Sequence, residues 1–394
     1  MMPPRPVPFA VPDIGEAEID AVVAVLRSRW LTTGRQCHDF EAAFAEQVGA
    51  SHAVALNSCT AALHLSLEAL GVAPGDLVFV SPYTFAASAE VIRYLGATPV
   101  LVDVDPATLN VDPVSLRTAV EEAFARGDGR PAAIMPVHFA GVPCPMDDIW
   151  ALARETGLAV VEDAAHAFPA AYADRPVGSG NADVRGTACF SFYATKTITT
   201  GEGGMLTTED EALADRARSM SLHGLNRQAW SRYSGGGWAY DVGAPGFKYN
   251  LTDIAAALGL VQLSRADEML KRRAEIAQAY TSAFAEIDSL ECPTVPDRVE
   301  TAWHLYPLRL HLDRSPVGRD PFIEGLKTRG IGASVHFIPL HLHSYYIQQY
   351  GYAPGDFPVA HAQFLREVSL PIYTAMTDQD VQRVIDAITE LAAR

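Results

Sequence analysis

The sequence from Leu158 reads LAVVEDAAHA, and from Cys189 it reads CFSFYATKTITTGEGGMLTT. Each stretch opens with a short apolar run, which is the pattern of a buried strand. The first run ends at Asp163, and the second leads into Lys196. A glycine-rich turn follows, and a third apolar run ends at Thr208. We therefore expect three buried strands, with a carboxylate at the end of one and a lysine just past another.

That arrangement indicates one chemistry. A lysine can form a Schiff base with pyridoxal phosphate (PLP), and Asp163 can keep the pyridine nitrogen of PLP protonated. His166 is then expected to lie against the ring or to reach its phenolic oxygen, and Ser191 is expected to donate to the phosphate. Lys196 also stands out because the chain has only four lysines. Taken alone, the lysine could be a solvated surface group and the acid a helix cap, but the joint pattern favours a PLP site.

Three motifs in this region resemble the core motifs of the DegT/StrS-type sugar aminotransferases, which are PLP enzymes of fold type I. They are EDAAH at 162–166, SFxxxK at 191–196 and TGEGG at 200–204. The resemblance continues through NSCTAALHL at 57–65, PYTFAAS at 82–88, PVHFAG at 136–141, KYNLTDI at 248–254 and SVHFIPLH at 334–341. It covers nearly the whole chain without a large insertion.

Apolar runs and helical patterns alternate from about residue 52 to 208, which predicts an α/β fold with a mostly parallel sheet covered on both faces. The resemblance implies a fold type I architecture, in which this sheet has seven strands between helices. It also implies a large PLP-binding domain over residues 1–263, with an N-terminal arm, and a smaller C-terminal α+β domain over residues 264–394. In the C-terminal part, the residue pattern predicts a strand at 334–338 and a helix at 359–367. In such sheets a ligand lies at the carboxyl ends of the strands.

Ser58 is the expected N-cap of the helix at 61–70, and the turn before this helix offers free backbone N–H groups to an anion. The resemblance implies that Cys59 and Thr60 bind the PLP phosphate there, with Cys59 acting as a small residue. It also implies that Phe85 stacks on the cofactor ring opposite His166. An ordinary capped helix and a core phenylalanine are the structural alternatives.

The resemblance further implies a homodimer with shared active sites, because Asn250 would reach the phosphate of the neighbouring subunit's PLP. It suggests substrate contacts at Thr32, Arg227, Arg232 and His336. A plain turn at Thr32 and solvated surface arginines are the alternatives. His138 is expected to be structural, although it follows a strand near the site.

The predicted reaction transfers an amino group from L-glutamate to a nucleotide-linked keto sugar. A 4-keto-6-deoxyhexose is favoured, because the segment 223–249 resembles members that act on such sugars. Amination at C3 of a sugar, or of a cyclitol, remains open, as does a non-catalytic partner protein that keeps the fold. Asp163, Ser191 and Lys196 argue against the partner protein. Lys196 also argues against sugar dehydration, since relatives that dehydrate carry histidine at that position.

Composition limits the class of protein further. The chain has 394 residues, 49% of them hydrophobic, and a net charge of −17, which argues against nucleic acid or an anionic membrane as a partner. No apolar run is long enough to span a membrane, and the N-terminus lacks the apolar core of a signal peptide, so we expect a cytoplasmic protein. We expect no metal site, because the five cysteines are scattered and the spacing of His336, His341 and His343 is loose.

Overall fold

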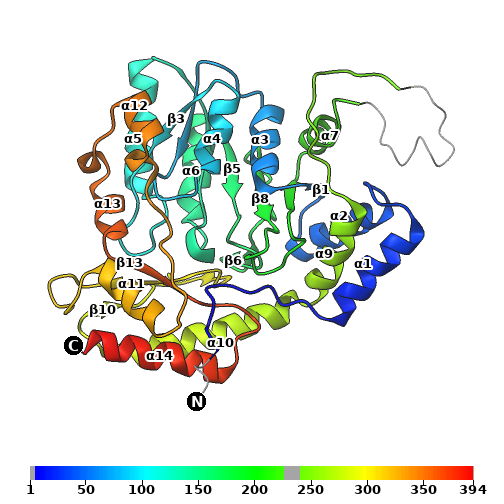
Figure 1. Ribbon diagram of the computed structural model, residues 1–394. Helices are drawn as coiled ribbons and strands as arrows, with labels where there is room; N and C mark the ends of the chain where they lie inside the picture. The colour runs from blue at the N-terminus through cyan, green and yellow to red at the C-terminus, as the bar shows by residue number, and fades with distance from the viewer. Residues whose placement is uncertain (1–4, 226–239, 394) are drawn as a thin grey trace.

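The computed structural model describes residues 5–225 and 240–393 (Figure 1). Its central sheet has seven strands in the order β1-β9-β8-β5-β4-β2-β3. These strands are β1 (His52–Leu56), β2 (Asp76–Val80), β3 (Thr98–Leu101), β4 (Arg130–Met135), β5 (Ala159–Asp163), β8 (Gly186–Ser191) and β9 (Gly204–Thr208). All neighbours are parallel except β9, which runs antiparallel to both β1 and β8. The expected mostly parallel, seven-stranded α/β sheet is confirmed.

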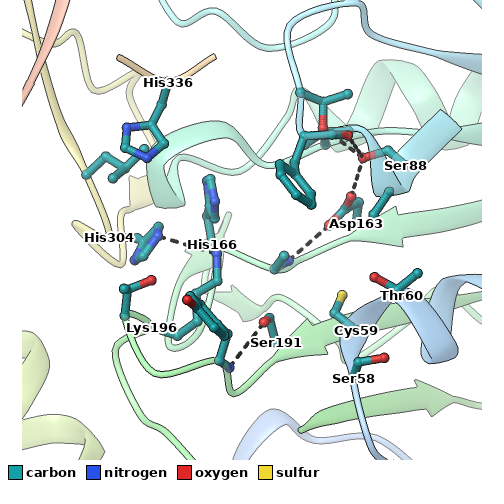
Figure 2. Close-up of a pocket in the computed structure, with 18 of the residues that line it drawn as sticks. Ser58, Cys59, Thr60, Ser88, Asp163, His166, Ser191, Lys196, His304 and His336 are labelled. Carbon is teal, nitrogen blue, oxygen red and sulfur yellow. Dashed lines mark hydrogen bonds between the residues drawn. The ribbon is translucent and has the colours of Figure 1, made fainter. Parts of the chain in front are cut away.

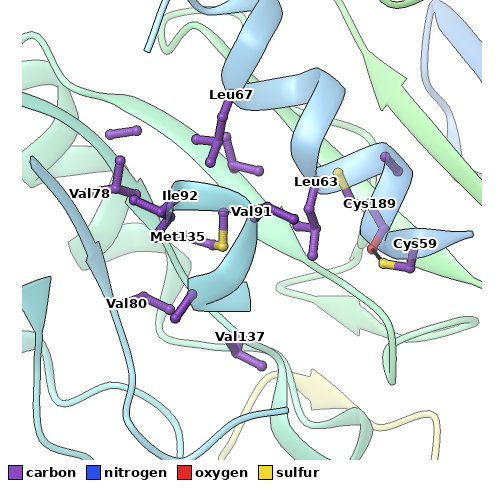
Figure 3. Close-up of a cluster of buried hydrophobic side chains, with 14 of the residues drawn as sticks. Cys59, Leu63, Leu67, Val78, Val80, Val91, Ile92, Met135, Val137 and Cys189 are labelled. Carbon is purple, nitrogen blue, oxygen red and sulfur yellow. Dashed lines mark hydrogen bonds between the residues drawn. The ribbon is translucent and has the colours of Figure 1, made fainter. Parts of the chain in front are cut away.

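Helices cover both faces of this sheet, because each strand points alternate side chains in opposite directions. In β2, Val78 and Val80 join the apolar cluster under α3 and α4, whereas Leu77 and Phe79 join the cluster under α5 and α6. Figure 3 shows the first of these clusters. The helices of this part are α1 (Glu16–Ser28), α2 (Arg35–Val48), α3 (Cys59–Ala69), α4 (Ala87–Tyr94), α5 (Pro113–Arg126), α6 (Met146–Thr156), α7 (Glu211–Met220) and α9 (Asp253–Ser264), with a 3-10 turn η1 (Phe139–Gly141).

The C-terminal part is built on a three-stranded antiparallel sheet in the order β10-β12-β13. Its elements are α10 (Ala266–Phe284), β10 (Leu290–Glu291), β12 (Tyr306–Leu310), α11 (Arg319–Thr328), η2 (Leu340–Leu342), α12 (Ser344–Tyr350), η3 (Pro354–Asp356), α13 (Pro358–Phe364), β13 (Glu367–Leu370) and α14 (Asp378–Ala392). A small sheet of β6 (Ala171–Tyr172), β7 (Arg175–Pro176) and β11 (Val299–Glu300) links the two parts.

The C-terminal part has its own hydrophobic cluster, which includes Tyr280, Leu308 and Phe322. The N-terminal arm enters this cluster, since Val7 is buried there and exchanges two backbone hydrogen bonds with Gly330 and Gly332. The division into domains 1–263 and 264–394 remains our proposal. Across the described residues, no helix combines the length and the hydropathy that a membrane crossing requires.

Two local predictions near the C-terminus are wrong. The strand expected at 334–338 is absent: Ser334 makes only an isolated bridge to Ser369, and the backbone N–H of His336 bonds to the Glu367 side chain instead of to a neighbouring strand. The helix expected at 359–367 ends at Phe364, and a strand follows it directly. That strand pairs with β12, a long-range interaction that overrides the local helical pattern.

Candidate active site

A cavity of about 490 Å³ opens where β1, β2, β4, β5 and β8 end (Figure 2). This edge is the ligand-binding edge of parallel sheets. Most of the site residues expected from the sequence line the cavity together: Cys59, Thr60, Phe85, Asp163, His166, Ser191, Lys196 and His336. The chain therefore brings residues from both of its halves to one place.

Asp163 lies at the last position of β5 and is only 5% exposed. Its Oδ2 accepts a 2.7 Å hydrogen bond from the Ser88 hydroxyl, and its Oδ1 accepts one of 3.2 Å from the backbone N–H of Ala165. Burial raises the pKa of Asp163, while the hydrogen bonds from Ser88 and Ala165 and the charge of Lys196 oppose that rise. A cationic N–H at this point of the cavity would favour the ionised carboxylate.

Lys196 follows β8 in a turn and points its amine into the same cavity. The Nζ atom lies 3.5 Å from Nε2 of His304. Burial lowers the pKa of Lys196 to about 8, although the nearby Asp163 raises it. A sizeable fraction of the amine is therefore neutral near pH 8, and the neutral amine is the nucleophilic and basic form.

Two histidines pack beside this lysine. The rings of His166 and His304 lie 4.3 Å apart between their centroids. Nδ1 of His166 accepts a hydrogen bond from the backbone N–H of Ala140, so in the neutral ring the proton is on Nε2. Burial lowers the pKa of both histidines well below its ordinary value, and the charge of Lys196 lowers it further. Both rings are thus neutral neighbours of the amine.

The start of α3 forms the opposite end of the cavity. Ser58 is the N-cap of this helix, as expected, and its hydroxyl accepts a 3.1 Å hydrogen bond from the backbone N–H of Ala61. Gly204 of β9 packs directly against the turn: a Cβ there would lie 2.4 Å from the backbone carbon of Ser58. Cys59 is buried, and burial raises the pKa of its thiol, which fits a small packing residue rather than a nucleophile.

The donor set of this cavity fits PLP. A lysine amine with a lowered pKa lies in the cavity with a buried carboxylate that favours a cationic partner. A helix N-terminus lies beside two hydroxyls, those of Thr60 and Ser191, and this combination suits a phosphate. The glycine at 204 leaves the turn at Ser58 close to the sheet, where a larger residue would displace it.

Phe85 lies at the mouth of the cavity with 63% of its surface exposed, and its ring centroid is 6.1 Å from that of Phe337. More than half of this side chain is therefore not covered by other residues of the chain. The expected stacking of Phe85 on the cofactor stays a prediction.

Several expected contacts do not line the cavity. Asn250 donates a 2.7 Å hydrogen bond to the Thr33 hydroxyl, and the carbonyl of Thr32 accepts one from the backbone of Asp253. The role of Asn250 concerns a second subunit and stays a prediction. Arg227 and Arg232 lie outside the described residues.

His138 is structural, as expected from the sequence. It is fully buried, its Nε2 bonds to Glu162 at 3.0 Å, and its Nδ1 accepts from the backbone N–H of Cys144. It does not line the cavity.

Two residues that touch the central groups, Ser88 and His304, were not expected from the sequence. Ser88 closes the motif PYTFAAS, so a signal for it is present in the sequence. His304 comes from the segment before β12 and carries no local signal. It reaches Lys196 only through the packing of the C-terminal part on the sheet.

Comparisons with known proteins agree with this geometry. Residues 12–389 match the model of the DegT/DnrJ/EryC1/StrS aminotransferase family. The chain is 50% identical over 386 residues to the spore coat polysaccharide biosynthesis protein SpsC of Bacillus subtilis (strain 168), covering 98% of this chain and 96% of SpsC.

Two solved structures are also similar over almost their full length. Spr1654 from Streptococcus pneumoniae, solved in PLP and PMP forms, superposes with a TM-score of 0.88 at 34% identity, covering 98% of this chain and 99% of that one. DesV from S. venezuelae, solved in complex with a ketimine intermediate, gives a TM-score of 0.88 at 32% identity and covers 99% of both chains.

Proposed function

Because the chain belongs to the DegT/DnrJ/EryC1/StrS aminotransferase family of PLP-dependent sugar aminotransferases, we propose that it aminates a nucleotide-linked keto sugar with L-glutamate as the amino donor. A 4-keto-6-deoxyhexose is the favoured acceptor. We also propose that it works as a cytoplasmic homodimer with shared active sites. The observation that best supports the reaction is the meeting of the Lys196 amine and the buried Asp163 carboxylate in one cavity.

PLP, when bound, supplies an aldehyde that reacts with an amine and a ring that withdraws electrons from the attached carbon. Lys196 would hold this group covalently between turnovers. Once released, Nζ would accept a proton from the α-carbon of the amino donor, and in the second half-reaction it would donate a proton to the sugar carbon that receives the amino group. Its pKa of about 8 suits both directions of that transfer.

The other residues of the site orient and hold PLP. Asp163 keeps the pyridine nitrogen protonated through a charge-assisted hydrogen bond. Thr60, Ser191 and the N-terminus of α3 hold the phosphate. His166 and His304 lie beside the amine as neutral rings, because burial keeps the pKa of each well below its ordinary value.

On the acceptor side, we propose that His336 contacts the ligand in the cavity, while Phe85 stacks on the cofactor ring opposite His166. Thr32, Arg227 and Arg232 remain proposed substrate contacts, and Asn250 remains the proposed contact to the phosphate bound by a second subunit. In this assignment the dimer brings Asn250 to its target, since within one chain Asn250 bonds to Thr33.

A panel assay tests this function. The PLP-loaded protein is incubated with L-glutamate and with nucleotide-linked 4-keto sugars, 3-keto sugars or a keto-cyclitol, and products are identified by mass spectrometry and NMR. We expect an amino sugar and one equivalent of 2-oxoglutarate, with 4-keto sugars reacting fastest. Glutamate turnover with amination of none of the sugars would overturn the proposed acceptor.

The same assay tests the lysine with a matched control. Lys196→Ala should lose at least ~1000-fold in turnover, because the covalent and proton-transfer roles share one amine. Lys327→Ala changes an exposed lysine that forms a surface ion pair with Glu324 and should keep normal activity. Undiminished turnover in Lys196→Ala would end the assignment, and a protein that takes up no PLP at all would favour the non-catalytic partner protein.

A further inference from the structure

A chain of three buried hydrogen-bonded groups leads from the interior of the C-terminal part to the cavity. Glu367 and Ser369, both in β13, are fully buried. The Ser369 hydroxyl bonds to Oε1 of Glu367 on one side and lies 2.9 Å from Nδ1 of His336 on the other. His336 lines the cavity (Figure 2), and Nε2 is the ring nitrogen that Ser369 does not contact.

The carboxyl group of Glu367 makes no ion pair within the described part of the chain. The two arginines nearest to it have other partners: Arg309 pairs with Glu291 at 2.7 Å, and Arg319 with Asp320 at 2.7 Å. The Tyr83 hydroxyl, also buried, faces the same region. Burial raises the pKa of Glu367 to about 8, against the opposing effects of its hydrogen bonds and of the two arginines.

His336 is surrounded by groups that keep its ring neutral. Burial and the charge of Lys196 lower the pKa of His336 to about 4, and His304 is a further neighbour. The ring stacks on Phe9 at 5.3 Å and packs edge-on against Phe337 at 5.0 Å, which fixes its orientation. Near neutral pH the ring is therefore uncharged, and its two possible states are the tautomers with the proton on Nδ1 or on Nε2.

The hydrogen bonds determine the tautomer of His336 for each protonation state of Glu367. Oε2 of Glu367 accepts from the backbone N–H of His336 at 3.0 Å, so a proton on the carboxyl group sits on Oε1. The protonated Oε1 donates to Ser369, Ser369 donates to Nδ1, and His336 then carries its proton on Nε2. When Glu367 is ionised, both hydrogen bonds reverse, Nδ1 carries the proton, and Nε2 is left as an acceptor.

We propose that Glu367 acts through Ser369 as a positioning residue that sets the tautomer of His336, so that Nε2 donates a hydrogen bond to an oxygen of the bound sugar substrate. The two states differ by one proton. Glu367 passes its proton to Ser369, Ser369 passes one to Nδ1, and Nε2 releases one into the cavity, with no movement of heavy atoms. The inference rests on the proposed function, since it assigns a donor to the acceptor substrate of that reaction.

The tautomer can be read directly in the wild-type protein. The PLP-loaded full chain is labelled with ¹⁵N-histidine, and the ring ¹⁵N shifts are followed from pH 6 to 10, with the His336 signals assigned by their loss in His336→Gln. We expect Nε2–H at low pH and Nδ1–H at high pH, with a midpoint near 8. A single unchanged tautomer over this range would refute the proposed relay, in which Glu367 controls the tautomer of His336 through Ser369.

Two variants separate the relay from a purely structural role. In Glu367→Gln, the amide oxygen can accept from the His336 backbone and the amide N–H can donate to Ser369, so Nε2–H should persist at every pH. Ser369→Ala removes the middle link, so the tautomer should no longer follow Glu367. Glu18→Gln is the matched control, because Glu18 is a buried acid of α1 that bonds to Arg265. It should leave the His336 transition in place.

Kinetics supply the second measurement. Between pH 7 and 9.5, the kcat/KM for the sugar should fall at least tenfold more in wild type than in Glu367→Gln, while the glutamate half-reaction responds equally in both proteins. If Glu367→Gln does not fold, the NMR titrations of wild type and of Ser369→Ala test the relay without it. A protein that aminates sugars without a tautomer change refutes the relay alone. A protein that aminates no sugar refutes the proposed function, while the NMR titration still judges the relay.

Discussion

The hydroxyl of Ser88 donates a 2.7 Å hydrogen bond to Oδ2 of Asp163, and thereby joins the first turn of α4 to the end of β5. The second oxygen of Asp163 is held by the backbone N–H of Ala165. These two donors favour the ionised carboxylate at a place where burial disfavours it. Ser88 thus sets both the position and the charge of the acid.

Removal of this donor should weaken cofactor binding. In Ser88→Ala the pKa of Asp163 rises further, and we expect PLP to dissociate about fivefold to tenfold more readily, equivalent to ~1 kcal/mol for one hydrogen bond. The dissociation constant is measured from the absorbance of PLP on dilution or dialysis. Ser264→Ala, which removes an exposed hydroxyl bonded only to a helical carbonyl, is the control. Equal PLP affinity in wild type and Ser88→Ala would refute the role.

The lowered pKa of Lys196 predicts how fast apoprotein takes up PLP. Only the neutral amine attacks the aldehyde, so the rate should rise with pH and reach half its maximum near pH 8, the value set by burial of the amine. Stopped-flow absorbance measures this rate, and Lys196→Ala should show no covalent phase. A rate that still climbs above pH 10 would mean that the amine behaves as an exposed lysine.

The close packing around Gly204 predicts that Gly204→Ala and Gly355→Ala differ sharply in stability and in PLP binding. A Cβ at 204 would lie 2.4 Å from the backbone of Ser58, so Gly204→Ala must displace the start of α3. We expect a loss of ~2 kcal/mol or more in the free energy of unfolding and at least tenfold weaker PLP binding. Gly355→Ala meets no atom within 4 Å and should change neither. Thermal unfolding and PLP titration of the two variants check this.

Glu367 predicts a pH dependence of stability. Its pKa is about 8 in the folded protein and near 4.5 ordinarily, so the folded state binds the proton more tightly. The stabilisation of the folded state by this proton is complete below pH 4.5 and is lost as the pH rises through about 8. Relative to wild type, Glu367→Gln should therefore gain stability between pH 5 and 8.5, by a few kcal/mol at most. Urea unfolding of both proteins at these two pH values measures the gain, and a constant difference would show that Glu367 is already ionised at pH 5.

The sequence alone predicted the parts of the molecule that are encoded locally. The strands around Asp163 and the turn to Lys196 follow from apolar runs and glycines, and the cap at Ser58 follows from its residue type. His304 and strand β13 were missed, because each depends on packing against residues far away in the chain. A periodic pattern describes which face of an element is buried, but it does not say which distant side chain will lie against that face.

The reversed strand β9 has a consequence for biosynthesis. It lies between β1 and β8, with Gly204 opposite Leu56 and Ser191. While the ribosome is still translating the middle of the chain, β1 has no neighbour in the sheet, and the turn that begins α3 has nothing to rest against. The end of the pocket at the start of α3, where we propose that the phosphate binds, can close only after residue 208 has emerged, so nascent chains that stall earlier would expose this apolar edge to chaperones.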